Sequence, residues 1–479
     1  MPLRNHRVSW TRRQLLLGTG ASLAAIALPA GRRAAAVGAA PTVIRARPGD
    51  AQLLPAGEPQ TAVWGFGGTV PGPVLRVRQG DTVRVRLENE LPQPTTIHWH
   101  GIRIENAMDG VAGLTQEAVP SGGRFDYAFT VPDAGTFWYH PHNLSWEQVA
   151  RGLYGLLIVD EASPPAVDQD IALVFDDWRL DEAGQIHEAS FGAMMDWSHA
   201  GRLGNTLTIN GQDLMDIPVS AGQRMRLRVC NTANARILNL RFEEHAHTVI
   251  AIDGQPVPPF ALEDGAMALM PGQRVDLIAD MTLNPGAEAA ITEVTGGGRL
   301  VAGRFVYDAQ AVTRATPLDP PAGLAANPLS EKLDLANAQD VTLRMEGGAM
   351  GRMQGATFRG QHLGMRELVA QGKVWAFNGQ AGMTDRPLFD APLGRTVRLA
   401  MVNDTNWPHA LHFHGHHVRE IARSQGSVRK DAWRDTVMVD RGETVTVAFV
   451  ADNPGKWMLH CHMLEHQAGG MATWFRVSA

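Results

Sequence analysis

The sequence has few cysteines and few aromatic residues, and after its first forty residues it has no long apolar run. Only Cys230 and Cys461 are cysteines among 479 residues, and aromatics make up 6%. A disulfide framework is therefore excluded, and at most one long-range disulfide could form. We expect no permanent membrane anchor, because no stretch beyond the N-terminal segment is long and apolar enough. The net charge is −6 and no basic stripe is present, which argues against nucleic acid as a partner.

Glycine and proline are abundant, with 50 and 29 residues. They lie between short runs rich in Val, Thr and Arg, a pattern typical of an all-β protein with many turns. The apolar fraction of 44% over 479 residues is enough for two or three domains with their own cores.

The N-terminus reads as a targeting segment. Residues 11–16 are TRRQLL, a twin-arginine pattern, and an Ala- and Gly-rich apolar stretch follows to residue 30. Small residues at 34–40 suit cleavage. We interpret residues 1–40 as a twin-arginine signal peptide, which predicts a bacterial protein exported in its folded state to the periplasm or beyond.

Two sequence patterns each occur three times. The first alternates apolar and polar residues around a turn, which we interpret as a β-hairpin with one buried face; it lies at residues 73–89, 217–231 and 392–403. The second is a turn followed by a short strand, at residues 121–127, 271–277 and 441–447. Repetition at roughly 150 residues predicts three copies of one β-sandwich. We place them at residues 41–160, 168–312 and 325–479.

The middle unit lacks the histidines of the outer two. Where the outer units have His-Trp-His at 98–100 and His-Phe-His at 412–414, the middle unit has Asn-Leu-Arg at 239–241. We interpret the middle unit as a spacer that sets the angle between the outer units.

Four His-x-His pairs lie in the outer units. On a β-strand the two histidines of each pair face the same side. If the outer units pack together, eight imidazoles converge, a set that suits three copper ions with ligands divided as two, three and three. They are His98, His100, His140, His142, His412, His414, His460 and His462.

Cys461 lies between two of these histidines and faces the opposite side of its strand. His409, His466 and Met471 are close to it in sequence. A thiolate, two imidazoles and a thioether suit a copper site for electron transfer. The spacing predicts that electrons enter at this site and cross the Cys461 backbone to His460 and His462.

These motifs resemble the multicopper oxidase family, of the three-domain bacterial laccase type, over residues 41–479. The resemblance rests on His-Trp-His-Gly at 98–101, Trp-Tyr-His-Pro-His at 138–142, His-x-x-His-x-His-Gly at 409–415 and His-Cys-His-x3-His-x4-Met at 460–471. It implies three cupredoxin-like Greek-key β-sandwiches and four copper ions. It gives type 1 copper to His409, Cys461, His466 and axial Met471, and type 2 copper to His98 and His412. One type 3 copper takes His100, His140 and His462, and the other takes His142, His414 and His460.

The resemblance also implies the reaction. Donors are oxidised one electron at a time at type 1 copper, through an exposed His466, and dioxygen is reduced to water at the other three ions. Asp109 matches the carboxylate near the type 2 copper that assists proton transfer. Close bacterial relatives carry a Glu directly after the last type 1 histidine, but this chain has Gln467. Glu465 is nearby, but we expect it to point elsewhere on an alternating strand.

The donor is less defined than the reaction. The resemblance implies phenols, amines or low-valent ions such as Cu(I), Fe(II) and Mn(II). The stretch at 405–408 lacks the Asp and Met found before the first type 1 histidine of cuprous oxidases. Residues 345–365 carry four methionines, and we interpret them as an exposed loop, with a Cu(I)-binding surface as the alternative; they are Met345, Met350, Met353 and Met365.

Other interpretations are a copper-binding tolerance protein with little turnover, a copper-free periplasmic scaffold, and a two-domain copper nitrite reductase. The scaffold predicts lost ligands, and the reductase predicts fewer repeats, so the sequence favours neither. We expect a monomer. Eight histidines lie outside both the His-x-His pairs and the Cys461 site, and we expect them to be structural. Two of them, His416 and His417, could contact the ligands of the cluster. The others are His6, His187, His199, His245, His247 and His362.

Overall fold

The computed structural model describes residue 3 and residues 40–479, except residues 296, 297 and 331. The expected signal peptide therefore lies outside the described residues, apart from residues 3 and 40. Strands dominate, and the α-helices have four to six residues. No helix in the described part of the chain could cross a bilayer. The expectation of an all-β fold built from three sandwiches is confirmed.

The first sandwich joins two four-stranded sheets. One has the order β2-β1-β4-β6, with bounds Thr61–Phe66, Thr42–Ala51, Thr82–Asn89 and Arg124–Thr130. The other has the order β3-β8-β7-β5, with bounds Leu75–Arg78, Gly155–Asp160, Gly135–His140 and His98–His100. Fully buried Leu87, Phe137 and Tyr139 lie in the core of this unit. Burying such large apolar side chains contributes roughly 2 kcal/mol each.

The middle sandwich has a six-stranded and a five-stranded sheet. The first is β10-β9-β12-β17-β14-β15, with bounds Thr206–Ile209, Gln169–Trp178, Arg224–Asn231, Arg274–Asp280, His247–Ile252 and Gln255–Ala261. The second is β11-β19-β18-β13-β16, with bounds Met215–Ala221, Leu300–Val312, Glu288–Glu293, Leu238–Phe242 and Ala266–Leu269.

The third sandwich repeats this plan with six and five strands. The first sheet is β23-β20-β25-β30-β27-β28, with bounds Trp375–Phe377, Gln339–Gly347, Thr396–Asn403, Thr444–Val450, Val418–Arg423 and Trp433–Arg434. The second is β24-β32-β31-β26-β29, with bounds Asp390–Pro392, Ala472–Ser478, Gly455–Cys461, His409–Phe413 and Thr436–Val439.

The three expected hairpins are wrong, and they are wrong in the same way. In each repeat the two strands on either side of the turn belong to different sheets: β3 and β4, β11 and β12, and β24 and β25. For example, β3 pairs with β8, whereas β4 pairs with β1 and β6. The alternation of apolar and polar residues indicates one buried face on each strand, but it does not identify the strand with which each one is hydrogen-bonded.

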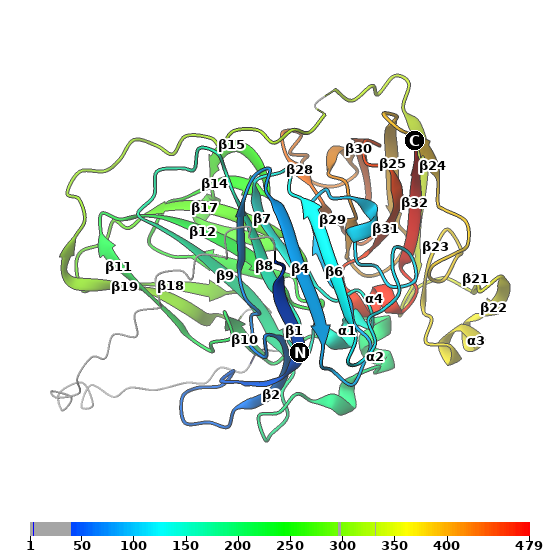
Figure 1. Cartoon of the computed structure of the whole chain (residues 1–479), viewed down its shortest axis with the longest axis horizontal. Coiled ribbons are helices and arrows are strands. Elements are labelled where there is room, and N and C mark those ends of the chain that lie inside the picture. Colours follow the sequence, from blue (N-terminus) through cyan, green and yellow to red (C-terminus); the bar gives the residue numbers. More distant parts are fainter. Residues whose placement is uncertain (1–2, 4–39, 296–297, 331) are drawn as a thin grey trace.

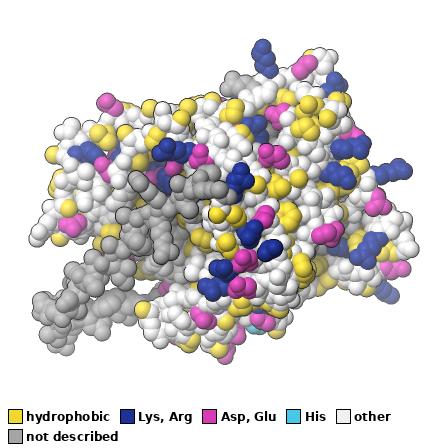
Figure 2. All heavy atoms as spheres, viewed as in Figure 1, with side chains coloured by type: hydrophobic (Ala, Val, Ile, Leu, Met, Phe, Trp, Pro, Cys, Tyr) yellow, Lys and Arg dark blue, Asp and Glu magenta, His cyan; other side chains and the backbone are white. Residues whose placement is uncertain are grey.

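The three units lie side by side in Figure 1, with the middle unit (green) on the left and the third unit (orange and red) on the right. The long connection from β19 to β20 runs over the top of the molecule. On the face in Figure 2, acidic and basic side chains are interspersed and histidine hardly shows. The paired histidines lie inside the molecule.

The short helices are α1 (Ser145–Gln148), α2 (Met194–Ser198), α3 (Met365–Ala370) and α4 (Leu464–Ala468), with single 3-10 turns η2 (Asn106–Met108), η3 (Glu188–Ser190) and η4 (Glu263–Gly265). Helices α1, α2 and α4 lie together, with α4 next to β31, whereas α3 lies beside β21 (Gly355–Phe358) and β22 (Gln361–Gly364) (Figure 1). Of these, α2 and α4 cover the Cys461 site.

The methionine-bearing stretch is not an exposed loop. Met345 lies on β20 and is fully buried, while Met353 and Met365 are half-buried. Strands β21 (Gly355–Phe358) and β22 (Gln361–Gly364) form a hairpin within it. Met350, which is 73% exposed, is the one of the four that faces solvent. The expectation failed because polar composition does not exclude a short hairpin.

Candidate metal centres

Three elements bring His409, Cys461 and His466 together. His409 begins β26, Cys461 ends β31, and His466 lies on α4. The Cys461 Sγ lies 3.7 Å from Nδ1 of each histidine, and those two nitrogens are 3.1 Å apart. Nitrogen ligands at about 2.0 Å around a tetrahedral ion lie roughly 3.3 Å apart, so this spacing fits a metal ion. All three residues are buried.

The local backbone fixes this group. The chain turns through α4 and returns, so that the Met471 N–H donates to the His466 carbonyl and the Cys461 N–H donates to the Met471 carbonyl. Met471 is buried in the same apolar cluster as Cys461. Burial raises the pKa of the Cys461 thiol to about 12. A bound metal ion would displace that proton.

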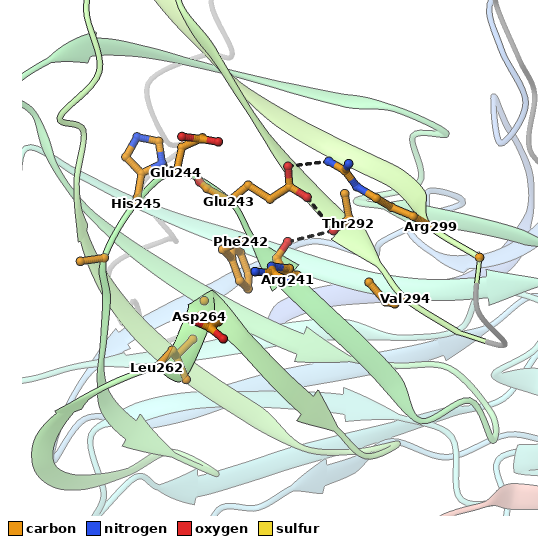
Figure 3. Close-up of a pocket in the computed structure, with 13 residues that line it drawn as sticks. Arg241, Phe242, Glu243, Glu244, His245, Leu262, Asp264, Thr292, Val294 and Arg299 are labelled. Atoms are coloured by element: carbon orange, nitrogen blue, oxygen red, sulfur yellow. Dashed lines mark hydrogen bonds and ion pairs between the residues drawn. The ribbon is translucent and has the colours of Figure 1, made fainter.

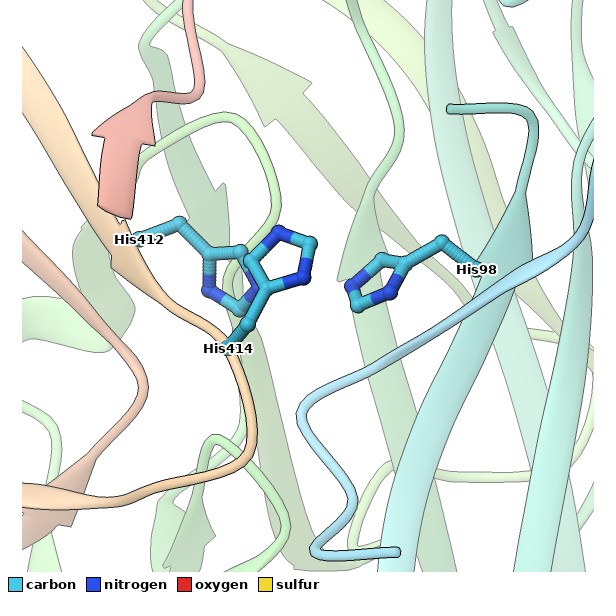
Figure 4. A group of neighbouring side chains, drawn as sticks. All are labelled: His98, His412 and His414. Carbon is cyan, nitrogen blue, oxygen red and sulfur yellow. The ribbon is translucent and has the colours of Figure 1, made fainter. Parts of the chain in front are cut away.

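The eight paired histidines form a second buried group. Strand register places His98 opposite His140 and His412 opposite His460, one pairing in each outer sandwich. Figure 4 shows His98 reaching from one side toward His412 and His414 on the other. The predicted convergence of the outer units is therefore observed. The eight are His98, His100, His140, His142, His412, His414, His460 and His462, all less than 7% exposed.

Most of these rings have one nitrogen hydrogen-bonded to the protein and the other facing inward. Nδ1 of His98, His140 and His412 donates to the backbone carbonyl of Asp109, Pro141 and Asp435, respectively. Their Nε2 atoms are buried without a hydrogen-bond partner among the described residues. A ring that donates one N–H and leaves the other lone pair free is the form that ligates metal. The donor set thus fits copper ions.

Three Nε2 atoms converge in one place. His460 Nε2 lies 3.3 Å from that of His142 and 3.2 Å from that of His414. Burial, followed by the neighbouring imidazoles, lowers the pKa of all three rings well below 6.5, so they are neutral. The lone pairs of neutral imidazoles repel one another at this distance unless a cation lies between them. This group too has the spacing of a metal site.

The predicted Asp109 lies at the cluster. It follows η2 and is buried. Its carboxylate accepts from His414 Nδ1 at 3.0 Å and lies 3.2 Å from His98 Nδ1. One carboxylate therefore touches a histidine from each outer sandwich.

The middle sandwich is more than a spacer, which corrects that expectation. A Cβ on Gly272 would lie 3.0 Å from both His100 and His462, so the turn before β17 forms one wall of the cluster. Sequence reasoning also missed Asp435, whose carboxylate lies 3.1 Å from His100 Nε2. His417 does reach this region, since its Nε2 lies 3.7 Å from Asp435. Asp435 has no motif around it, so no sequence signal marked it.

His466 is not exposed, contrary to expectation. It is fully buried, and its Nε2 donates to the His199 carbonyl at 2.6 Å. Residues 197 and 198, which end α2, and the C-cap residue His199 cover the site. The backbone of His199, which the sequence left without a role, therefore touches a predicted metal ligand.

The expected place of Glu465 is also wrong. It lies on α4, not on an alternating strand, and is buried, with Oε1 accepting from Asn234 at 2.8 Å. Burial raises its pKa. Gln467 accepts from the Ser145 hydroxyl at 3.0 Å. A helix places Glu465 and Gln467 on different faces, and β periodicity does not apply to them.

A cavity of about 720 Å³ opens in the middle sandwich, away from these groups (Figure 3). His245 lines it, but both of its ring nitrogens have partners, the Tyr307 hydroxyl at 2.5 Å and the Glu243 carbonyl at 3.1 Å. Glu243 is paired with Arg299 at 2.5 Å. His245 is thus satisfied structurally, as expected.

Comparison with known proteins agrees with the geometry. Three family models described as multicopper oxidase match residues 49–164, 169–288 and 359–479. Multicopper oxidase MmcO of Mycobacterium tuberculosis is 32% identical over 87% of this chain and 83% of its own length. The chain belongs to the multicopper oxidase family, whose members are copper-containing oxidoreductases.

Two solved structures share the whole fold. The multi-copper oxidase from Pseudomonas thermotolerans is 32% identical, with a TM-score of 0.80 over 92% of this chain and 99% of that one. Lac15 from a marine microbial metagenome is 40% identical, with a TM-score of 0.73 over 91% of this chain and 100% of that one.

Proposed function

We propose that this chain oxidises small reductants at a type 1 copper held by His409, Cys461, His466 and Met471, and passes the electrons to a trinuclear copper cluster that reduces dioxygen to water. The bound copper ions supply the one-electron redox steps and the site for dioxygen. The cluster ligands are those that the family resemblance gives: His98 and His412 for type 2 copper, His100, His140 and His462 for one type 3 copper, and His142, His414 and His460 for the other.

The observation that carries this proposal is the placement of the two groups on either side of β31. Cys461 Sγ faces His409 and His466, while His460 faces the imidazole cluster. His460 Nδ1 also donates to the Cys461 carbonyl at 2.9 Å. A covalent path of a few bonds and this hydrogen bond therefore both connect the two sites.

Asp109 is the carboxylate that we assign to proton handling. Reduction of dioxygen to water consumes protons at the cluster, and a positioned carboxylate can hold and deliver them. Its contacts with His98 and His414 support this role.

The buried His466 favours donors that transfer electrons without binding its ring. A phenol cannot hydrogen-bond to Nε2 while the His199 carbonyl occupies it. We therefore propose that low-valent metal ions and small phenols react at the surface formed by residues 197–199, and that bulky phenols are slow.

Oxygen consumption tests the proposal. The copper-loaded protein should consume dioxygen with at least one of a phenol, Cu(I), Fe(II) or Mn(II), and steady-state rates would rank the four donors. A blue, fully loaded protein that consumes no oxygen with any of them would instead support the alternative, a copper-binding tolerance protein.

We also propose export through the twin-arginine pathway, on the TRRQLL segment at residues 11–16, and a monomeric state. Replacing Arg12 and Arg13 by lysine should retain the protein in the cytoplasm, measured by cell fractionation. Size-exclusion chromatography with light scattering would test the monomer, for which the sequence mass is 51.9 kDa.

A further inference from the structure

Arg274 connects all three sandwiches at the edge of the imidazole cluster. It is the first residue of β17, in the sandwich without histidine ligands, and is 0% exposed. Its Nε donates to the Thr136 carbonyl at 3.1 Å in the first sandwich. Its Nη1 donates to the Gly272 carbonyl at 3.1 Å in the middle one. The remaining donors face Asp435, in the third.

Arg274 donates hydrogen bonds to the Asp435 carboxylate from both terminal nitrogens. Nη1 lies 3.0 Å from Oδ1, and Nη2 lies 2.7 Å from Oδ2. This two-point contact matches the planar fork of a guanidinium and fixes the plane of the carboxylate. Asp253 adds support, because its carboxylate accepts from the Arg274 N–H at 3.1 Å and from the Asp435 N–H at 3.3 Å.

Asp435 in turn orients two predicted ligands. His100 Nε2 lies 3.1 Å from Oδ1, and His412 Nδ1 donates to the Asp435 carbonyl at 3.0 Å and lies 3.5 Å from Oδ1. The two rings stack with centroids 3.7 Å apart. Each ring gives its N–H to Asp435, so His100 Nδ1 and His412 Nε2 are left free, and both are buried without a partner among the described residues.

Gly101 packs directly against this contact. A Cβ on Gly101 would lie 2.2 Å from Arg274 Nη2 and 2.4 Å from Asp435 Oδ2. Gly101 also has φ +85°, a conformation that glycine adopts without strain. The residue after His100 must therefore be glycine for the guanidinium to lie beside the ligand strand.

We propose that Arg274 is a positioning residue for the cluster: by holding the Asp435 carboxylate it fixes the tautomer and orientation of His100 and His412. The middle sandwich thereby controls ligands that the outer two supply. Without the guanidinium, the Asp435 carboxylate would lose the two-point contact that fixes its plane, and it would rotate. Rotation would take away the acceptor that the His100 N–H requires.

The test is R274K, which keeps the charge but loses the two-point contact. R274K should bind copper at the histidine-only sites roughly 10–100-fold more weakly, the usual effect of losing a group that orients a ligand. Copper per chain, measured by elemental analysis during chelator titration, should fall while the blue absorption of type 1 copper persists. The electron paramagnetic resonance signal of the type 2 copper should weaken or change its hyperfine splitting.

R224K is the matched control. Arg224 also makes a two-point contact with an aspartate, Asp280, through Nε at 2.6 Å and Nη2 at 2.7 Å, in the same β12–β17 pair but away from the histidines. R224K should keep the copper content and the resonance spectrum of the unaltered protein. If R274K matches R224K in both, the proposal is overturned.

A double-mutant cycle separates positioning from general stability. If Arg274 acts through Asp435, D435N should reproduce the R274K spectrum, and R274K should add little in the D435N background. Additive losses would overturn the proposal. Should R274K not fold, D435N alone carries the test, and retained copper and an unchanged spectrum in D435N would refute it.

The inference rests on the proposed copper cluster, and the experiment distinguishes the two. Unaltered protein that binds no copper at the histidines refutes the proposed function. Unaltered protein that binds it, with R274K unchanged, refutes only the role of Arg274.

Discussion

At Cys461, a single residue separates two metal groups. Its Sγ faces His409 and His466, and the adjacent His460 points toward His142 and His414. The alternation of a β-strand produces this division directly, because neighbouring side chains leave opposite faces. The chemistry of the two sites can therefore be separated by single substitutions.

Cys461→Ser should abolish the intense blue absorption, because the thiolate is the ligand that gives this type of copper site its character. The histidine cluster should still bind copper, so copper per chain should fall by about one ion. Visible spectra and elemental analysis check this. Cys230→Ser is the control: Cys230 is a buried free thiol in the middle sandwich, and its loss should leave the colour unchanged.

His247 gives a prediction about pH that is independent of copper. Burial lowers its pKa from 6.5 to about 4. The unfolded chain therefore binds more protons than the folded one between these pH values, so the free energy of unfolding falls as the pH drops from about 6.5 to 4. At 1.4 kcal/mol per unit, the loss amounts to about 3 kcal/mol below pH 4.

His247→Gln should make the loss of stability of the copper-free protein between pH 7 and pH 4.5 smaller by about 2 kcal/mol. Denaturant unfolding at pH 7 and at pH 4.5 measures the difference. If the unaltered protein and His247→Gln lose the same free energy of unfolding between the two pH values, His247 does not contribute.

At the scale of elements, the C-terminal end of α2 and its C-cap residue His199 are hydrogen-bonded over the predicted type 1 ligands. Three successive carbonyls accept from the third sandwich: that of Trp197 from the Trp375 indole at 2.6 Å, that of Ser198 from the Ala349 N–H at 2.7 Å, and that of His199 from His466. The middle sandwich thus covers a site built by the third.

Trp197→Ala should loosen this cover, because the indole packs against Trp146 with centroids 5.6 Å apart. A packing loss of about 2 kcal/mol would raise the fraction of molecules in which residues 197–199 are detached from His466 by up to roughly 30-fold. We expect kcat/KM for a bulky phenol to rise, while the rate with a small metal ion changes little. Steady-state kinetics with both donors checks this, and equal effects on both would argue against a cover that selects by size.

At the scale of the whole molecule, the proposed copper sites would join the outer sandwiches. Each predicted site of the cluster takes histidines from both of them. Direct contacts between the two are also present, for example Arg103 with Asp452 at 3.4 Å, and Arg103 bonds the connecting segment at the Pro328 carbonyl. Metal binding and docking of the sandwiches are therefore coupled.

Removing copper should lower the thermal midpoint, because only the folded arrangement brings the ligands together. A ligand present at 1,000 times its dissociation constant stabilises by about 4 kcal/mol per site. Calorimetry of copper-loaded and chelator-treated protein measures the shift, and re-addition of copper should reverse it. Identical midpoints would contradict the coupling.

The sequence by itself determined the repeated sandwich and predicted the ligands. His-x-His spacing and strand alternation are local properties, so His98, His412 and Cys461 could be identified without any fold, and the family resemblance supplied their pairing. The same local rules failed where the partner is distant: β3 and β4 look like a hairpin but belong to different sheets.

Only the tertiary structure decided what surrounds those ligands. Arg274 and Asp435 are 161 residues apart, and the His199 carbonyl that covers His466 is 267 residues away from it. No periodicity connects such positions, because their contacts come from the packing of three sandwiches. The predicted ligands lie on strands or in the short segments that follow them, whereas their orientation and their cover come from the interfaces between sandwiches.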